Sequence, residues 1–235
     1  METAQSLTVE TVTGHQVDPL NPDPATISIH GIAWSLSRIP RFVGHTITEI
    51  PYNVAQHSIY VSELAEFILT APPEACTEDG IAADVLHRAR SEIKDQDVAC
   101  ALLLALLHDG HEAYIGDIPS PIKRIPEIRT TLKDIERRLD LAIRSAVLPV
   151  ECRCSIEFKA ERELFLASAQ SLVGYCDKLA QSIESYQFMP SRGKSWNLPH
   201  PSLTLLQRFV QPMTPLQSYR SFLERFEKLR ARINT

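Results

Sequence analysis

Apolar residues recur at helical spacing along most of this chain, and few segments alternate in the manner of strands. The segment ISIHGIAWSLSRIPRF, from Ile27, has an apolar residue every three or four positions until Pro40 interrupts it. The segment NVAQHSIYVSELAEFILT has one broad apolar face and ends before Pro72 and Pro73. These patterns predict an all-α fold.

The segment DVACALLLALLHDGHEAYIG, residues 97–116, is apolar almost all round. A helix without a polar face belongs in a protein interior, so we expect this one to be the buried central helix. Gly110 should loosen it locally, and Gly116, followed by two prolines, should end it. Further helices are expected over 81–96, 127–148, 158–188 and 214–233, and loops over 71–80 and 191–201.

The chain is long enough for one sizeable domain with additional segments at its ends, since it has 235 residues of which 44% are apolar. Residues 1–26 are polar and rich in Pro, Asp and Asn, which predicts an irregular N-terminal arm. We expect a core over 27–190 and a helical C-terminal extension over 191–235 that packs on it. The segment 71–96 is interpreted as an insertion.

The formal net charge of −5 argues against a partner that is a nucleic-acid polymer, which would require a basic face. An anionic small molecule remains compatible if a few cations line a pocket. The N-terminus has no targeting pattern, and no run approaches the roughly 18 apolar residues of a membrane span. A soluble cytoplasmic protein without a membrane partner is therefore expected.

The five cysteines include no CxxC pair, and their usage fits a reducing compartment. Cys152 and Cys154 form a CxC pair, which leaves a surface redox pair as the less favoured alternative.

Four residues with metal-binding side chains lie beside apolar faces of three different predicted helices: His57, His108, Asp109 and Asp177. Each alone is most simply a solvated or capping residue, but three helices can bring all four to one point. Two imidazoles and two carboxylates suit one divalent transition metal, Mn, Fe, Co, Ni or Zn, better than Mg or Ca. The sequence thus predicts a metal site between helices.

The four residues form an H...HD...D pattern within the segments PYNVAQHSIYVSEL, LLHDGHEAYIGDIPSPIK and GYCDKLAQSIE. This pattern resembles the HD-domain phosphohydrolases, and specifically their YfbR-like 5′-deoxynucleotidase branch. The resemblance covers roughly residues 27–190, and within this range the segments RFVGHT and VAQHS also resemble the family. It implies an HD-domain helical bundle, a metal-dependent activity on deoxynucleotides and a homodimer.

The resemblance also implies roles for individual residues. Glu112, four residues after His108 and expected on the same helical face, would orient or deprotonate the attacking water. Asp117 would hydrogen-bond the sugar, and Arg41 would hold the phosphate. Phe42 stands where many members have Trp and would stack on base or ribose.

Lys123 is a second phosphate-binding candidate, weaker than the arginine. His111, where similar sequences have small residues, is interpreted as a solvated histidine beside the pocket, with an approach to metal or substrate as the alternative.

The leading hypothesis is hydrolysis of the 5′-phosphoester of deoxynucleoside monophosphates to deoxynucleoside and phosphate. The alternatives are a deoxynucleoside triphosphate triphosphohydrolase, a non-catalytic nucleotide sensor, and a hydrolase of cyclic or signalling nucleotides. Few extra Lys or Arg residues lie near the motifs, which favours monophosphates. The sequence does not determine base preference or native metal.

Overall fold

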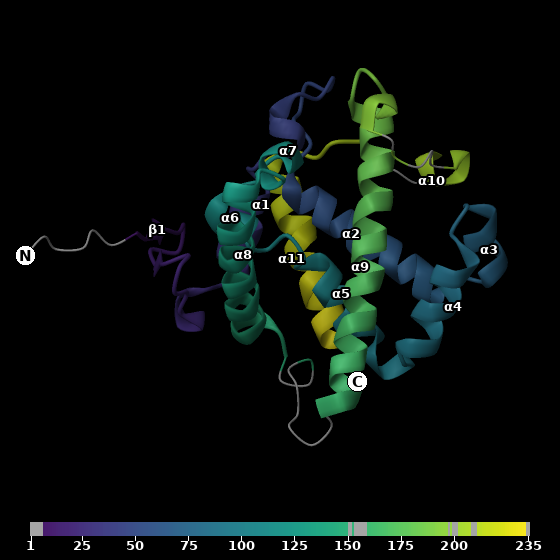
Figure 1. Cartoon of the computed structure of the whole chain (residues 1–235), viewed down its shortest axis with the longest axis horizontal. Coiled ribbons are helices and arrows are strands. Elements are labelled where there is room, and N and C mark those ends of the chain that lie inside the picture. The colour runs from purple at the N-terminus through teal and green to yellow at the C-terminus, as the bar shows by residue number, and fades with distance from the viewer. Residues whose placement is uncertain are drawn as a thin grey trace, which may run out of the picture.

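The computed structural model of the chain describes residues 7–149, 152, 159–196, 198, 202–207 and 211–233. These residues form a helical bundle, which confirms the all-α prediction (Figure 1). Its helices are α1 (Ile29–Leu36), α2 (Val54–Thr70), α3 (Pro73–Glu78), α4 (Ala83–Glu92), α5 (Val98–Leu106), α6 (Glu112–Ile115), α7 (Ser120–Lys123), α8 (Pro126–Val147), α9 (Lys159–Phe188), α10 (Leu203–Gln207) and α11 (Pro215–Ala231).

The apolar helix α5 lies at the centre of the bundle. All of its residues are buried, and it packs against α2, α9 and α11. In Figure 1 the long helix α9 runs across the face of α2 and α5. The helix without a polar face is therefore buried on every side, as its sequence predicts.

Helix α2 begins at a well-defined point because Asn53 caps it by accepting a hydrogen bond from the amide of Gln56. The Asn53 amide also donates to Ser218 Oγ at the start of α11, and Gln56 exchanges hydrogen bonds with the backbone of Gln211 and Met213. These contacts hold the first turns of α2 against the C-terminal segment.

Further along α11, the buried guanidinium of Arg225 donates to Ser62 O and Glu66 of α2. The C-terminal helix is thus fixed to the helix that carries His57.

Two predicted irregular segments contain regular structure. The N-terminal arm includes an antiparallel pair of two-residue strands, β1 (Val9–Glu10) and β2 (Gln16–Val17). The predicted loop over 71–80 contains α3. Pro73 occupies the first turn of this helix, where proline is tolerated, so the Pro-Pro pair marks its start. The prediction of a loop was wrong there.

The predicted helix over residues 97–116 is broken into α5 and α6. Helix α5 ends at Leu106, and the backbone leaves helical geometry at Leu107 before α6 starts at Glu112. Gly110 N donates to Leu107 O, and a Cβ at Gly110 would lie 3.0 Å from that oxygen. A larger residue at Gly110 would therefore be tightly packed in this turn. His108 and Asp109 lie in the turn rather than on a helix.

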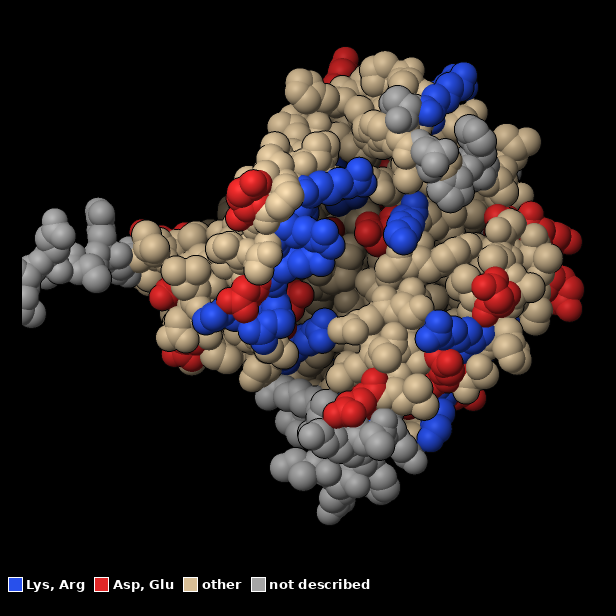
Figure 2. All heavy atoms as spheres, viewed as in Figure 1, with Lys and Arg blue, Asp and Glu red and all other residues tan. Residues whose placement is uncertain are grey.

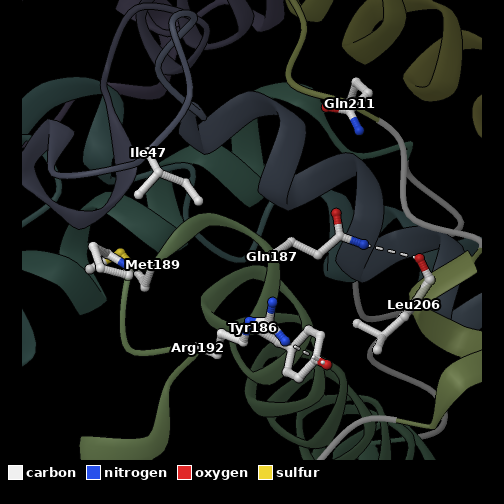
Figure 3. A pocket seen from close by; sticks show the side chains of 8 residues that line it. Ile47, Tyr186, Gln187, Met189, Arg192, Leu206 and Gln211 are labelled. Carbon is white, nitrogen blue, oxygen red and sulfur yellow. Dashed lines mark hydrogen bonds between the residues drawn. The ribbon is translucent and has the colours of Figure 1, made fainter.

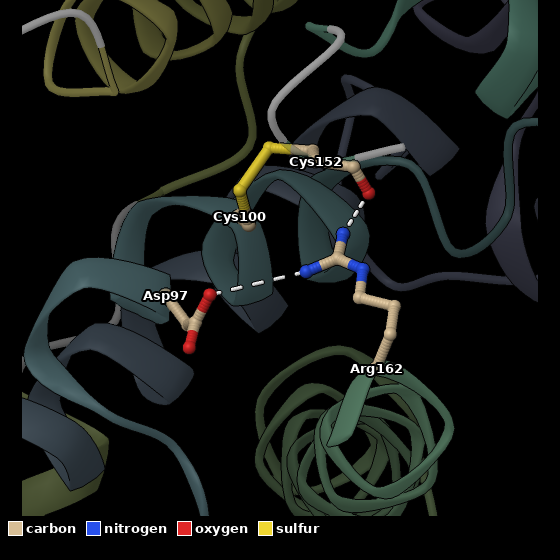
Figure 4. The surroundings of a disulfide bond; sticks show 4 residues. All are labelled: Asp97, Cys100, Cys152 and Arg162. Atoms are coloured by element: carbon tan, nitrogen blue, oxygen red, sulfur yellow. Dashed lines mark hydrogen bonds and ion pairs between the residues drawn. A yellow bond between two sulfur atoms is a disulfide. The ribbon is translucent and has the colours of Figure 1, made fainter. Parts of the chain in front are cut away.

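A disulfide joins Cys100 of α5 to Cys152, which precedes α9 (Figure 4), and this bond is at odds with the reducing compartment inferred from the cysteine pattern. Arg162 donates to the backbone oxygen of Cys152 and lies 3.9 Å from Asp97. Because Cys152 is buried and bonded to Cys100, a surface pairing of Cys152 with Cys154 is wrong, and Cys154 itself lies outside the described residues. Within the described residues, no helix combines the length and apolar character needed to cross a membrane.

Candidate active site

The four predicted metal ligands converge where α2, the turn after α5, and α9 meet. His57 Nε2 lies 3.5 Å from Asp109 Oδ2 and 3.2 Å from Asp177 Oδ1. His108 Nε2 lies 3.2 Å from the same Asp109 oxygen, and the two imidazole rings are 5.1 Å apart. Side chains separated by up to 120 positions in sequence thus face one small volume.

The orientation of both histidines fits a cation between them. His57 Nδ1 contacts Glu184, and His108 Nδ1 contacts the carbonyl oxygen of Ala105 at 2.8 Å, so each Nδ1 is placed to carry the proton. Both Nε2 atoms are buried without a hydrogen-bond partner and face carboxylates. Unprotonated nitrogens and carboxylate oxygens repel one another unless a positive charge lies among them, so these donors fit a divalent metal.

The carboxylates strongly perturb the two histidines. Burial and the Arg41 cation oppose protonation of His57, but the Glu184 and Asp177 carboxylates outweigh them and raise its pKa. Burial likewise opposes protonation of His108, and the Asp109 carboxylate outweighs it and raises the His108 pKa to about 9. Burial alone would raise the pKa of Asp109, yet the neighbouring histidines and Arg41 hold it well below its usual range. The cluster therefore attracts positive charge, whether protons or a metal.

Glu184 is the residue at this site that the sequence reasoning missed. It is fully buried. Its Oε1 lies 2.6 Å from His57 Nδ1 and accepts a hydrogen bond from the Tyr52 hydroxyl. Its Oε2 lies 3.5 Å from Arg41 Nε. Glu184 follows Asp177 by seven positions, two turns on the same face of α9. That spacing in GYCDKLAQSIE was the available signal.

Arg41 lies at the start of the loop between α1 and α2, and backbone hydrogen bonds join the two ends of this loop. Its amide donates to Tyr52 O, Pro40 bridges Asn53, and Ile47 N donates to Phe188 O at the end of α9. The Arg41 guanidinium, 3.5 Å from Asp109 Oδ2, lies beside the candidate metal ligands. The Glu184 and Asp109 carboxylates outweigh burial and raise its pKa, so it stays charged.

Glu112 is buried at the N-terminus of α6. It does not share a helical face with His108, as the spacing predicted, because the helix is interrupted between the two residues. Donor atoms of Asp109, His111 and Glu112 lie within 4.8 Å of one another. Burial, reinforced by Asp109 and Asp117, raises the pKa of Glu112 to about 9 against the opposing charges of Arg41 and Lys123.

Lys123 of α7 lies 3.6 Å from Glu112 Oε1 and 3.2 Å from Glu136 Oε1. His111 is buried rather than solvated, with Nδ1 3.0 Å from Asp140 and Nε2 3.7 Å from Glu136 of α8. The structure thus places His111 in a polar contact with α8.

Phe42 lies beside Arg41, with the guanidinium carbon 5.7 Å from its ring centre. Its ring stacks on Trp196, with centres 5.6 Å apart. Asp117 follows α6 and is half-buried, and its charge acts on both Arg41 and Glu112.

Figure 2 shows Lys and Arg side chains gathered beside a hollow between α8 and α9. A separate cavity of about 610 Å³ lies past the end of α9, where Gln187 donates to Leu206 O (Figure 3). None of the predicted site residues lines that cavity, whose lining residues are Ile47, Tyr186, Gln187, Met189, Pro190, Arg192, Leu206 and Gln211.

An all-helical bundle with a His and Asp cluster between its helices defines the HD-domain class of metal-binding phosphohydrolases. Residues 32–227 match the model of the family described as 5′-deoxynucleotidase YfbR-like, and the chain belongs to that family.

The chain is similar to two uncharacterized bacterial proteins. It is 29% identical to one from Rhodobacter capsulatus, over 73% of this chain and 76% of the relative. It is 28% identical to YfdR of Escherichia coli, over 90% of this chain and 88% of YfdR.

Among solved structures, it matches the cyanophage S-2L HD phosphohydrolase DatZ bound to dA and one catalytic Zn²⁺ ion. The TM-score is 0.41 and the sequence identity 18%, with 89% of this chain and 99% of DatZ covered.

Proposed function

We propose that this protein is a 5′-deoxynucleotidase that hydrolyses deoxynucleoside monophosphates to deoxynucleoside and phosphate. The observation that carries the proposal is the surroundings of Asp109. The buried carboxylate of Glu112 lies within 4.8 Å of it, and the buried guanidinium of Arg41 lies 3.5 Å from it. A base and an anion-binding cation beside a metal-binding cluster are the groups that phosphoester hydrolysis needs. Membership of the YfbR-like family supports the choice of a deoxynucleotide.

In the proposed site His57, His108, Asp109 and Asp177 hold one divalent transition metal. When bound, such a metal lowers the pKa of a coordinated water and polarises the phosphorus. Two imidazole nitrogens with carboxylate oxygens suit Mn, Fe, Co, Ni or Zn.

The remaining steps belong to the chain's own side chains. Arg41 binds the phosphate through its guanidinium, whose charge the surrounding carboxylates maintain. A Glu112 oxygen would accept a proton as the water oxygen attacks phosphorus. Burial raises the pKa of this carboxyl to about 9 in the metal-free protein, and the positive charges of Arg41, Lys123 and a bound metal would favour its ionised form. The phosphorus to 5′-oxygen bond breaks, and the leaving 5′-oxygen takes up the proton that Glu112 accepted, which gives the deoxynucleoside and phosphate.

Asp117 and Phe42 would complete the substrate pocket, Asp117 by hydrogen bonding the deoxyribose and Phe42 by stacking. Lys123 is the second cation near the phosphate. Activity in the cytoplasm and assembly as a homodimer remain predictions.

A second candidate reaction, release of triphosphate from deoxynucleoside triphosphates, is favoured by Lys123, a second cation that lies 3.6 Å from Glu112 Oε1. Extra cations of this kind could neutralise a longer polyphosphate.

Product identification separates these candidates. The protein loaded with Mn or Co is given the mono-, di- and triphosphates of each deoxynucleoside, and products are resolved by anion-exchange chromatography. Release of inorganic phosphate from monophosphates is expected. Release of triphosphate would favour the second candidate, and metal binding without turnover of any nucleotide would favour a sensor.

A further inference from the structure

A stacked aromatic pair lies next to the phosphate-binding arginine of the proposed reaction, and its second member comes from a distant segment. Phe42 follows Arg41, whereas Trp196 lies in the short 3-10 helix Lys194–Trp196 beyond the end of α9. The rings are 5.6 Å apart with an angle of 29° between their planes, a stacked arrangement. Trp196 remains 39% exposed, so its ring is accessible to a ligand.

The backbone under Phe42 is strained. Phe42 and Val43 both have a φ of 56°, in the left-handed region that bulky and β-branched residues rarely adopt. Such strain persists only where surrounding contacts impose it, and it is common at ligand-binding sites. Here the contacts are the bonds that close the loop, from Arg41 N to Tyr52 O and from Ile47 N to Phe188 O.

A glycine positions the Trp196 segment. Gly193 has a φ of 72°, and a Cβ at this residue would lie 2.3 Å from Ser185 Oγ. Trp196 N donates to Gly193 O, so the turn that presents the indole lies directly on α9. Ser185 is the neighbour of Glu184, which contacts both His57 and Arg41. The turn that carries the indole and the Glu184 carboxylate therefore both rest on the last turns of α9.

We propose that Phe42 and Trp196 together form the base subsite, and that Trp196, from the segment after α9, selects nucleotides over sugar phosphates that lack a base. This inference rests on the proposed function. Along the chain of contacts, Asp109 lies 3.5 Å from Arg41, whose guanidinium carbon lies 5.7 Å from the Phe42 ring centre. Arg41 thus contacts both a candidate metal ligand and the first ring of the aromatic pair, so the pair adjoins the side chain that would hold the phosphate. An aromatic face accepts any base by stacking.

Steady-state kinetics of Trp196→Ala test the proposal with two substrates, a deoxynucleoside 5′-monophosphate and 2-deoxyribose 5-phosphate, which lacks the base. We expect kcat/KM for the nucleotide to fall about 5- to 100-fold, mainly through KM, because stacking on an aromatic ring contributes to binding. The base-free substrate should be unaffected, and Trp196→Phe should restore most of the loss. Leu203→Ala, at an exposed apolar position of the same C-terminal part, is the matched control.

An unchanged kcat/KM for the nucleotide in Trp196→Ala would overturn the proposal. An equal loss on both substrates would also overturn it, because it would indicate a purely structural role.

A binding measurement separates this inference from the proposed reaction. The chain has two tryptophans, and Trp34 packs against Arg38 and Tyr219. In a Trp34→Phe background, stacking of a deoxynucleoside on Trp196 should quench the indole fluorescence in a saturable manner. Quenching without turnover would support the base subsite while the proposed reaction fails, and the absence of quenching by all four deoxynucleosides would overturn the base subsite even if the enzyme is active.

Discussion

Glu184 Oε1 lies 2.6 Å from Nδ1 of His57, and neither side chain is accessible to solvent. A carboxylate in this position fixes the tautomer that directs the Nε2 lone pair away from it, toward Asp109 and Asp177. The other Glu184 oxygen faces Arg41, so one buried carboxylate supports both the candidate metal ligand and the candidate phosphate-binding cation. Burial opposes its ionisation, but His57 and Arg41 outweigh burial and lower the pKa of Glu184.

Replacing Glu184 with Gln should weaken metal binding about 10- to 100-fold, because the amide keeps the shape but loses the charge that supports His57. Metal titration followed by calorimetry measures the change. Glu227→Gln, at an exposed position of α11 beside Arg230, should bind metal like the wild type. Wild-type affinity in Glu184→Gln would remove Glu184 from this role.

Replacing Asp109 with Ala should abolish most metal binding, because Asp109 Oδ2 lies 3.5 Å from His57 Nε2 and 3.2 Å from His108 Nε2. Elemental analysis of the purified protein reads the bound metal directly. Asp134→Ala on the exposed side of α8 is the control, since its partners are the surface arginines Arg137 and Arg138. Metal retained at the wild-type level in Asp109→Ala would show that the ion binds elsewhere.

Replacing Glu112 with Gln should leave metal content intact and lower kcat about 10²- to 10⁴-fold, the usual contribution of a general base. The measurement pairs elemental analysis with single-turnover kinetics on a deoxynucleotide. Glu127→Gln, in the first turn of α8 and exposed, should be without effect. A normal rate in Glu112→Gln would exclude this carboxylate from the chemistry.

Glu112 should also make the metal-free protein less stable as pH rises. Its folded pKa of about 9 is raised from 4.5, so between these values the folded state holds a proton that the unfolded state has lost. The stability contributed by the neutral carboxyl is therefore complete below about pH 4.5 and declines until the pH passes about 9. Glutamine cannot ionise, so Glu112→Gln should not show this decline. The free energy of unfolding of the variant, relative to that of the wild type, should therefore increase with pH.

Chemical denaturation with chelator present, at several pH values from 5 to about 9, measures that difference. A constant difference across the range would contradict the raised pKa.

Loss of the disulfide should destabilise the fold. Cys100 and Cys152 are 52 positions apart, and opening a loop of this size typically costs about 2–5 kcal/mol. The double variant Cys100→Ser with Cys152→Ser should show that loss in urea denaturation, and a reductant should lower the stability of the wild type but leave the variant unchanged. Equal stability of the wild type with and without reductant would contradict a structural role for the bond.

Local patterns in the sequence determined much of this protein. The apolar periodicity predicted α1, α2, α4, α8, α9 and α11 close to their observed bounds, because each helix buries one face against the bundle. The spacing H...HD...D, with its flanking motifs, identified four side chains that the structure brings together, and the family match supports the class of protein. Their roles in catalysis remain predictions.

The tertiary structure alone decided which groups surround those four side chains. Glu184 contacts His57 across 127 positions, and Trp196 reaches Phe42 from the C-terminal part of the chain, so neither pairing leaves a local pattern. The break between α5 and α6 falls at Leu107, inside the segment 97–116, whose apolar pattern predicts one continuous helix. Helical periodicity records which face of a segment is buried, but it carries no information about the partner that covers that face.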